Sequence, residues 1–207
     1  MSNPMAMDIM NQDEFYDCNF TDLCVDGMEL NNKLFEQCTF IHSSFVETKL
    51  FSCKFIDCEF KSCNLSSIQV KNSSFSETVF DESKMIGINW TLAKWPLIKL
   101  SSPIKIYKSN ISHSSFFELE LRDLVIEECK AQDVDFRGCD LSNACFLLTD
   151  LQGSQFMRTK LYAANFTDAI NYTINPTEND IRKGKFSLPD ALNLLNHFDI
   201  ELSNGDV

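Results

Sequence analysis

The chain has few glycines, few basic residues and no long apolar run. Six glycines in 207 residues leave no Gly-rich phosphate-binding loop. No segment approaches the roughly 18 consecutive apolar residues of a membrane-spanning helix, and the first eleven residues lack the basic and apolar regions of a signal peptide. These absences lead us to expect a cytoplasmic protein.

The deficit of positive charge also limits the choice of partner. The 18 Lys and Arg residues against 30 Asp and Glu give a formal net charge of -12, with a pI near 4.6. Such a chain would be repelled by the phosphates of nucleic acids and by anionic membranes. If the partner is charged, we expect it to be a basic protein.

The body of the chain follows a period of five residues. Every fifth residue from Phe15 to Trp90 is apolar, which gives sixteen core centres. The period fails between Thr91 and Lys105 and resumes one residue out of phase, with thirteen further centres from Ile106 to Phe166. The position two residues before each centre is mostly Cys, Ser, Thr or Ala. Each five-residue repeat therefore has two positions that point inward, one large and one small, and three mostly polar positions that point outward. This pattern predicts a solenoid, because one repeat is too short to bury its own apolar face.

These repeats resemble those of the pentapeptide-repeat family, whose consensus is a small residue, any residue, then Leu or Phe, then two polar residues. The clearest examples are Cys53-Lys54-Phe55, Cys58-Glu59-Phe60, Cys63-Asn64-Leu65 and Ala164-Asn165-Phe166. The resemblance implies an all-β fold, a right-handed quadrilateral β-helix of about seven coils with four repeats each. We predict a lead-in over 1–12, the β-helix over 13–170 with its phase break at 91–105, and a C-terminal helical cap over 171–207.

Two shorter segments are similar to particular subgroups of that family. Residues 126–141 are similar to Qnr-type quinolone-resistance proteins, and residues 174–181 and 191–195 to McbG-type microcin-immunity proteins. The resemblance implies a DNA-mimicking rod that binds DNA gyrase or topoisomerase IV and protects it from an antibiotic or toxin. The alternative is a general scaffold or adaptor with an unrelated protein partner.

The repeat register also predicts where the acidic residues lie. We assigned successive centres to four faces and assumed that the phase break adds one residue. Most of the excess acid then falls on two adjoining faces before the break, opposed only by Lys54 and Lys61. This acidic stripe consists of Glu14, Asp17, Asp22, Glu36, Asp57, Glu59, Glu77, Asp81 and Glu82. It is either a solvated face that keeps a β-rod soluble or a surface that fits a basic groove.

The irregular segment at the phase break is a second candidate for partner binding. Two Trp, two Pro and two Lys lie within residues 90–103, and Trp90, Lys94 and Trp95 are the expected contacts. The alternative is a bulge whose Trp side chains fill the core.

The C-terminal segment predicts a cap for the solenoid. Ser187-Leu188-Pro189-Asp190 resembles a capping box before an amphipathic α-helix. The family's C-terminal helices imply a tail-to-tail homodimer, with Leu188, Leu192, Leu195 and Phe198 as the dimerisation residues. The alternative is a cap without dimerisation.

The sequence offers no catalytic, metal or cofactor site that we would select. Cys18, Cys38 and Cys58 lie twenty residues apart and should stack in one column, which is not a tetrahedral arrangement, and no C-x-x-C pair is present. The three His residues, at positions 42, 113 and 197, show no local nucleophile-base arrangement. We therefore predict a binding protein rather than an enzyme, with no cofactor and no metal.

Overall fold

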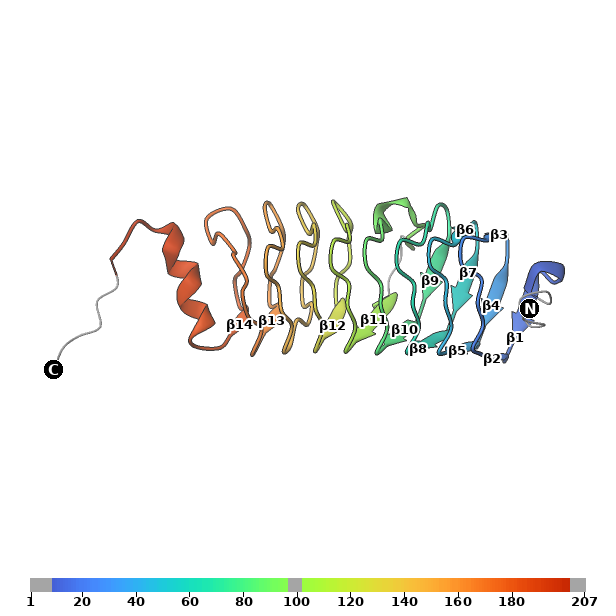
Figure 1. Ribbon diagram of the computed structural model, residues 1–207. Helices are drawn as coiled ribbons and strands as arrows, with labels where there is room; N and C mark the ends of the chain where they lie inside the picture. The colour runs from blue at the N-terminus through green and yellow to red at the C-terminus, as the bar shows by residue number, and fades with distance from the viewer. Residues whose placement is uncertain (1–8, 97–101, 202–207) are drawn as a thin grey trace.

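The chain forms a rod of stacked coils (Figure 1). A computed structural model describes residues 9–96 and 102–201. Each coil takes twenty residues over most of the length, because strands pair in parallel with the strand one coil later, as Phe15 does with Phe35 and Phe35 with Phe55. The rod is a parallel β-solenoid, as the five-residue period predicts, and it has about 8 turns where about seven were expected.

Four faces run along the rod, and we number them in chain order. Face 1 carries β1 (Glu14–Tyr16), β4 (Leu34–Glu36), β7 (Lys54–Ile56) and β9 (Ser74–Ser76). Face 2 carries β2 (Asn19–Thr21), β5 (Thr39–Ile41), β8 (Glu59–Lys61), β10 (Thr78–Asp81), β11 (Ile104–Tyr107) and β12 (Val125–Glu127), and further along it β13 (Asn165–Phe166) pairs with β14 (Lys185–Phe186). Face 3 follows face 2 in each coil and is held by isolated bridges such as Asn64 to Lys84. Face 4 carries β3 (Glu29–Asn31) and β6 (Lys49–Phe51).

The core centres form continuous columns of stacked rings. Phe40, Phe60 and Phe80 on face 2 are stacked with centroid separations of 4.6 and 5.0 Å. The Phe35 and Phe55 rings on face 1 are stacked at 5.0 Å, and the two columns meet edge to face, as Phe35 and Phe40 do at 5.4 Å. These are separations that aromatic rings prefer, so the Phe centres pack closely along these two columns.

The small residues two positions before each centre also bind the backbone. The hydroxyl of Thr48 donates to Val25 O at 2.8 Å, and that of Ser73 to Leu50 O at 2.7 Å, in each case 23 residues back along the chain. Larger side chains would displace the neighbouring rings. The position therefore favours small residues whose side chain can donate a hydrogen bond to the backbone.

One residue in this column breaks the pattern. Lys33 is 6% exposed, and its ammonium donates to Asp13 Oδ1 at 2.8 Å, to Met10 O at 3.2 Å and to Gln12 O. The three oxygens satisfy the three donors of a buried ammonium. Lys33 thereby fastens the N-terminal lead-in to the first coil, which its sequence position did not predict.

The corners of the coils are residues in the left-handed region, two positions after each centre. Asp17, Asp57 and Glu82 have φ angles of 51°, 50° and 49°. Asp and Asn tolerate this conformation, whereas for most other residues it costs about 1–2 kcal/mol. The corner side chains of Asp17, Asp57 and Glu82 are all exposed, which places these carboxylates on the edges of the rod.

The phase break adds six residues, so the assumption that it adds one is wrong. Ser74 pairs with Lys94, twenty residues on, but Thr78 pairs with Ile104 and Phe80 with Ile106, each 26 residues on. The extra residues therefore lie between Lys94 and Ile104, and residues 97–101 fall outside the described part of the chain. A five-residue period cannot distinguish a slip of one from a slip of six. As a result, Ile106 continues face 2, and the charges after the break move by one face.

The stacking continues past the predicted boundary at residue 170. Tyr172 and Ile174 are buried in the core, and Phe186 on β14 stacks on Phe166 at 5.1 Å. These centres were missed because their spacing departs from five, and together with the partly buried Trp95 they bring the expected seven coils to about eight.

The C-terminal helix differs in detail from the prediction. It is the 3-10 helix η2 (Asp190–His197), and η1 (Trp90–Leu92) is a second short one at the break. The expected capping box is not formed, because Ser187 Oγ accepts from Asp168 N at 3.1 Å and Asp190 Oδ1 accepts from Asn171 N at 3.2 Å. Both side chains instead fasten the tail to the last coil. Among the described residues, no helix is long and apolar enough to cross a membrane.

Candidate partner-binding surfaces

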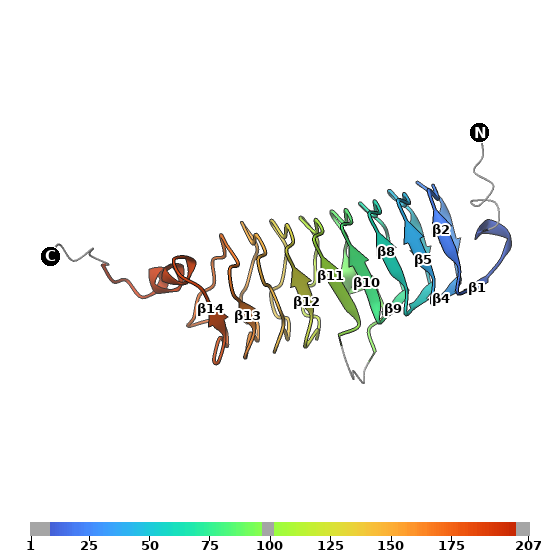
Figure 2. The same cartoon turned by 90° about the horizontal axis from the view of Figure 1, so that it is seen from below.

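The acidic stripe lies on faces 1 and 2 of the N-terminal half. Glu14 lies on β1 and Glu36 on β4, while Asp17, Asp57 and Glu77 follow one another along the corner between the two faces. The remaining members lie on face 2 or at its far corner: Asp22, Glu59, Asp81 and Glu82. Figure 2 shows β2, β5, β8 and β10 in order along the rod, with β1, β4 and β9 on the adjoining side. All nine residues precede the break, so the six-residue slip leaves the stripe where the register predicts it.

The stripe is exposed and only lightly neutralised. None of the nine residues is buried. Glu59 pairs with Lys61 at 2.9 Å, and Glu82 accepts a hydrogen bond from Ser62 Oγ at 3.3 Å. At the N-terminal end, Glu14 accepts from the Tyr16 hydroxyl at 2.9 Å, and this hydrogen bond raises the pKa of the Tyr16 phenol. Surface contacts of this kind are weak, and the stripe keeps a net negative charge.

The irregular segment at the phase break exposes fewer side chains to a partner than expected. Trp90 is fully buried, stacked on Phe116 at 5.9 Å and edge-on to Phe75 at 5.3 Å. It serves the core and offers no surface to a partner, which corrects its expected role. Trp95 is partly buried and donates its indole N–H to Trp90 O at 3.0 Å, while Lys94 is exposed.

The expected dimerisation residues lie at the opposite end of the rod. Leu188 is 75% exposed, and Leu192 and Phe198 are about half exposed. Leu195 is partly buried, and its neighbour Leu194 packs against the core. The tail therefore covers the last coil with one side and presents apolar side chains on the other.

Comparison with known proteins agrees with this geometry. Residues 33–103 match the description of a pentapeptide repeat region, and residues 120–156 that of pentapeptide repeats in eight copies, together about half of the chain. The chain belongs to the pentapeptide-repeat family. No curated protein matches the sequence.

The chain is similar to solved structures of other pentapeptide-repeat proteins. A trypsin-treated variant of QnrB1, a plasmid-mediated fluoroquinolone resistance protein, is 18% identical with a TM-score of 0.54, over 92% of this chain and 100% of that one. HetL, involved in heterocyst differentiation regulation in the cyanobacterium Nostoc sp. strain PCC 7120, is 10% identical with a TM-score of 0.40, over 89% of this chain and 94% of that one. At these identities the likeness to QnrB1 establishes the β-helix and leaves the partner open.

Six of the nine cysteines in this pentapeptide-repeat chain are buried and serve packing. Cys38 and Cys58 are buried and donate their thiols to Phe15 O and Phe35 O, at 3.5 and 3.3 Å. Burial raises the pKa of Cys129 to about 12, and that of Cys63 to about 11, so these thiols stay protonated and unreactive. In the described part of the chain, no group of three or more His, Cys, Asp or Glu side chains is placed to hold a metal ion.

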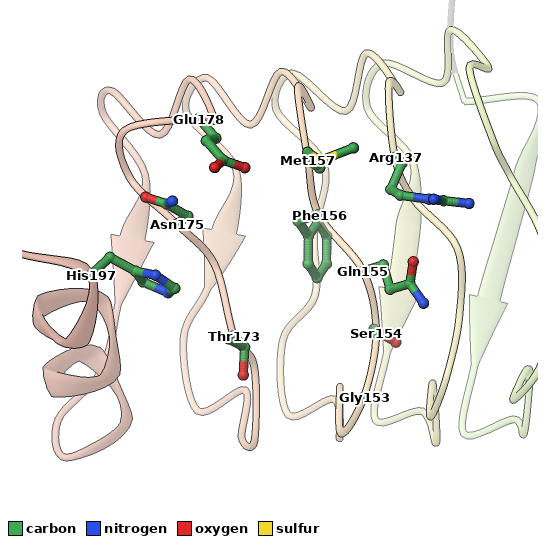
Figure 3. A pocket seen from close by; sticks show the side chains of 10 residues that line it. All are labelled: Arg137, Gly153, Ser154, Gln155, Phe156, Met157, Thr173, Asn175, Glu178 and His197. Carbon is green, nitrogen blue, oxygen red and sulfur yellow. The ribbon is translucent and has the colours of Figure 1, made fainter.

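A pocket lies at the C-terminal end of the pentapeptide-repeat rod, which the sequence did not indicate. It has a volume of about 530 Å³ and opens between face 4 of the last coils and η2 (Figure 3). Its lining residues are Arg137, Gly153, Ser154, Gln155, Phe156, Met157, Thr173, Asn175, Glu178 and His197. The signal for it was the loss of the five-residue spacing after Phe166.

Proposed function

We propose that this chain is a non-catalytic rod that binds a type II topoisomerase, DNA gyrase or topoisomerase IV, and modulates or protects it. The observation that carries the proposal is the acidic stripe on two adjoining faces of a β-helix. The fold-level likeness to QnrB1, a fluoroquinolone resistance protein, supports the choice of partner. Such a partner would require the chain to be in the cytoplasm with the chromosome.

The density of charge in the stripe supports mimicry of DNA. Nine carboxylates and two lysines, Lys54 and Lys61, leave a net charge of about -7 over four coils. Four coils at the ~4.8 Å strand spacing span roughly 19 Å, over which duplex DNA carries about eleven charges. The stripe therefore offers roughly two-thirds of the charge density of DNA, along a straight rod that a basic groove can follow.

The proposal includes a homodimer formed through the C-terminal segment. Leu188, Leu192 and Phe198 would be buried between two copies, since exposed apolar side chains gathered at one end favour association. A tail-to-tail pair would place the two acidic stripes at the far ends of a longer rod.

Supercoiling of relaxed plasmid by purified DNA gyrase tests the proposal. The reaction is measured with and without a fluoroquinolone, and separately with and without a microcin, over increasing concentrations of the chain. We expect the chain to restore supercoiling in the presence of one of these inhibitors, or to inhibit supercoiling when no inhibitor is added. If the chain neither protects nor inhibits gyrase at micromolar concentration, the proposed partner is rejected.

A further inference from the structure

The pocket at the C-terminal end arises from a change of spacing on face 4. Phe156 pairs with Ile174, eighteen residues on, whereas Lys160 pairs with Asp180, twenty residues on. The segment from Ile174 to Asp180 therefore holds two more residues than the segment it covers. It folds into a turn, in which Asn175 O accepts from Glu178 N at 3.2 Å. This turn and η2 flank the open pocket (Figure 3).

The walls of the pocket combine an apolar floor with a polar rim. Phe156 is 5% exposed and forms the floor, and the neighbouring Met157 is 37% exposed and forms one side. The polar residues Gln155, Thr173 and Glu178 also line the pocket. Such a pocket suits a ligand with an apolar stem and a group rich in hydrogen-bond donors.

The charge left unbalanced in the pocket is negative. Arg137 donates to both carboxylate oxygens of Asp135, at 2.9 and 2.8 Å, and lies over the Phe117 ring at 5.5 Å. This pairing holds the pKa of the Asp135 carboxyl below its usual value, so Arg137 and Asp135 neutralise each other. Glu178 has no ion pair with any described residue. Arg158 donates its backbone N–H to Glu178 O, but its side chain does not line the pocket.

The ring of His197 lines the pocket on the side of η2. Its Nε2 atom is buried, and no described residue forms a hydrogen bond with it. This nitrogen is not exposed to the pocket.

We propose that this pocket binds the side chain of an arginine or lysine from a basic protein partner. The cation would pair with Glu178, and its methylene stem would lie against Met157 and Phe156. This site lies beyond the acidic stripe, at the other end of the rod, and it does not depend on the partner being a topoisomerase.

Binding of N-acetyl-arginine methylamide, followed by NMR of the Met157 methyl group and the His197 ring, tests this site. We expect saturable shifts at both groups at low ionic strength, with millimolar affinity, and weaker shifts from the citrulline analogue, which has the same shape without the charge. Glu178→Gln should weaken the affinity about two- to fivefold, as the loss of one exposed ion pair does.

The matched control is Glu118→Gln, a carboxylate of the same corner column that lies outside the pocket. It should leave the affinity unchanged, and the amide spectrum of each variant establishes that the rod is folded. The proposal is overturned if no saturable shift occurs at up to about 20 mM ligand, or if the citrulline analogue binds equally well. It is also overturned if Glu178→Gln and Glu118→Gln behave alike. None of these results bears on the supercoiling assay.

Discussion

Neutralising four carboxylates of the acidic stripe is expected to weaken binding to DNA gyrase by about 10- to 100-fold at low ionic strength. The variant carries Asp57→Asn, Glu59→Gln, Asp81→Asn and Glu82→Gln. Each change removes one charge from the surface proposed to face a basic groove, and about 0.35 to 0.7 kcal/mol for each of the four sums to this factor. Equilibrium binding to purified gyrase, measured over a series of salt concentrations, gives both the affinity and its salt dependence.

The control variant also loses four negative charges, but from faces 3 and 4 and their corners. It carries Glu29→Gln, Glu47→Gln, Glu118→Gln and Asp133→Asn, none of which belongs to the stripe. We expect this control to bind nearly as tightly as the unaltered chain, and the stripe variant to show the smaller salt dependence, because it makes fewer ionic contacts. Equal losses in the two variants would mean that total charge, rather than the stripe, governs binding.

Replacing Phe60 with alanine is expected to lower the free energy of unfolding by about 3–5 kcal/mol. The Phe60 ring is 1% exposed and lies between Phe40 and Phe80, at 4.6 and 5.0 Å. Its removal leaves a cavity in a column of rings that the short strands cannot close. Urea unfolding followed by circular dichroism measures the loss.

Phe117→Ala is the matched control, because Phe117 is a ring on the outside of the rod and 36% exposed. We expect this variant to lose less than about 1 kcal/mol. A loss of that size for Phe60→Ala as well would contradict the view that stacked rings hold the coils together.

The five-residue period predicted most of the fold, because core centres and corners recur at fixed positions in every coil. Phe15, Phe35 and Phe55 stack as expected, and corner positions carry five of the nine residues of the stripe. The period did not predict the length of the slip, since a one-residue and a six-residue insertion restore the same phase. Only the pairing of Phe80 with Ile106 distinguishes them.

The remaining differences have a common physical cause, which is that burial overrides local pattern. Trp90 looked like a surface anchor because it lies where the period fails, yet it fills the core beside Phe116. Ser187 and Asp190 resemble a helix cap, but both side chains accept hydrogen bonds from backbone N–H groups of the last coil instead. The pocket beside Glu178 depends on how two irregular segments meet, and the repeat carries no information about that.

Competition with DNA tests the central claim most directly. Binding of the chain to purified DNA gyrase is measured while duplex DNA is added to saturation of the enzyme. If the acidic stripe occupies the DNA-binding groove, the DNA should displace the chain completely, and the apparent affinity should fall in proportion to the DNA concentration. Unchanged binding of the chain to DNA-saturated gyrase would contradict the account.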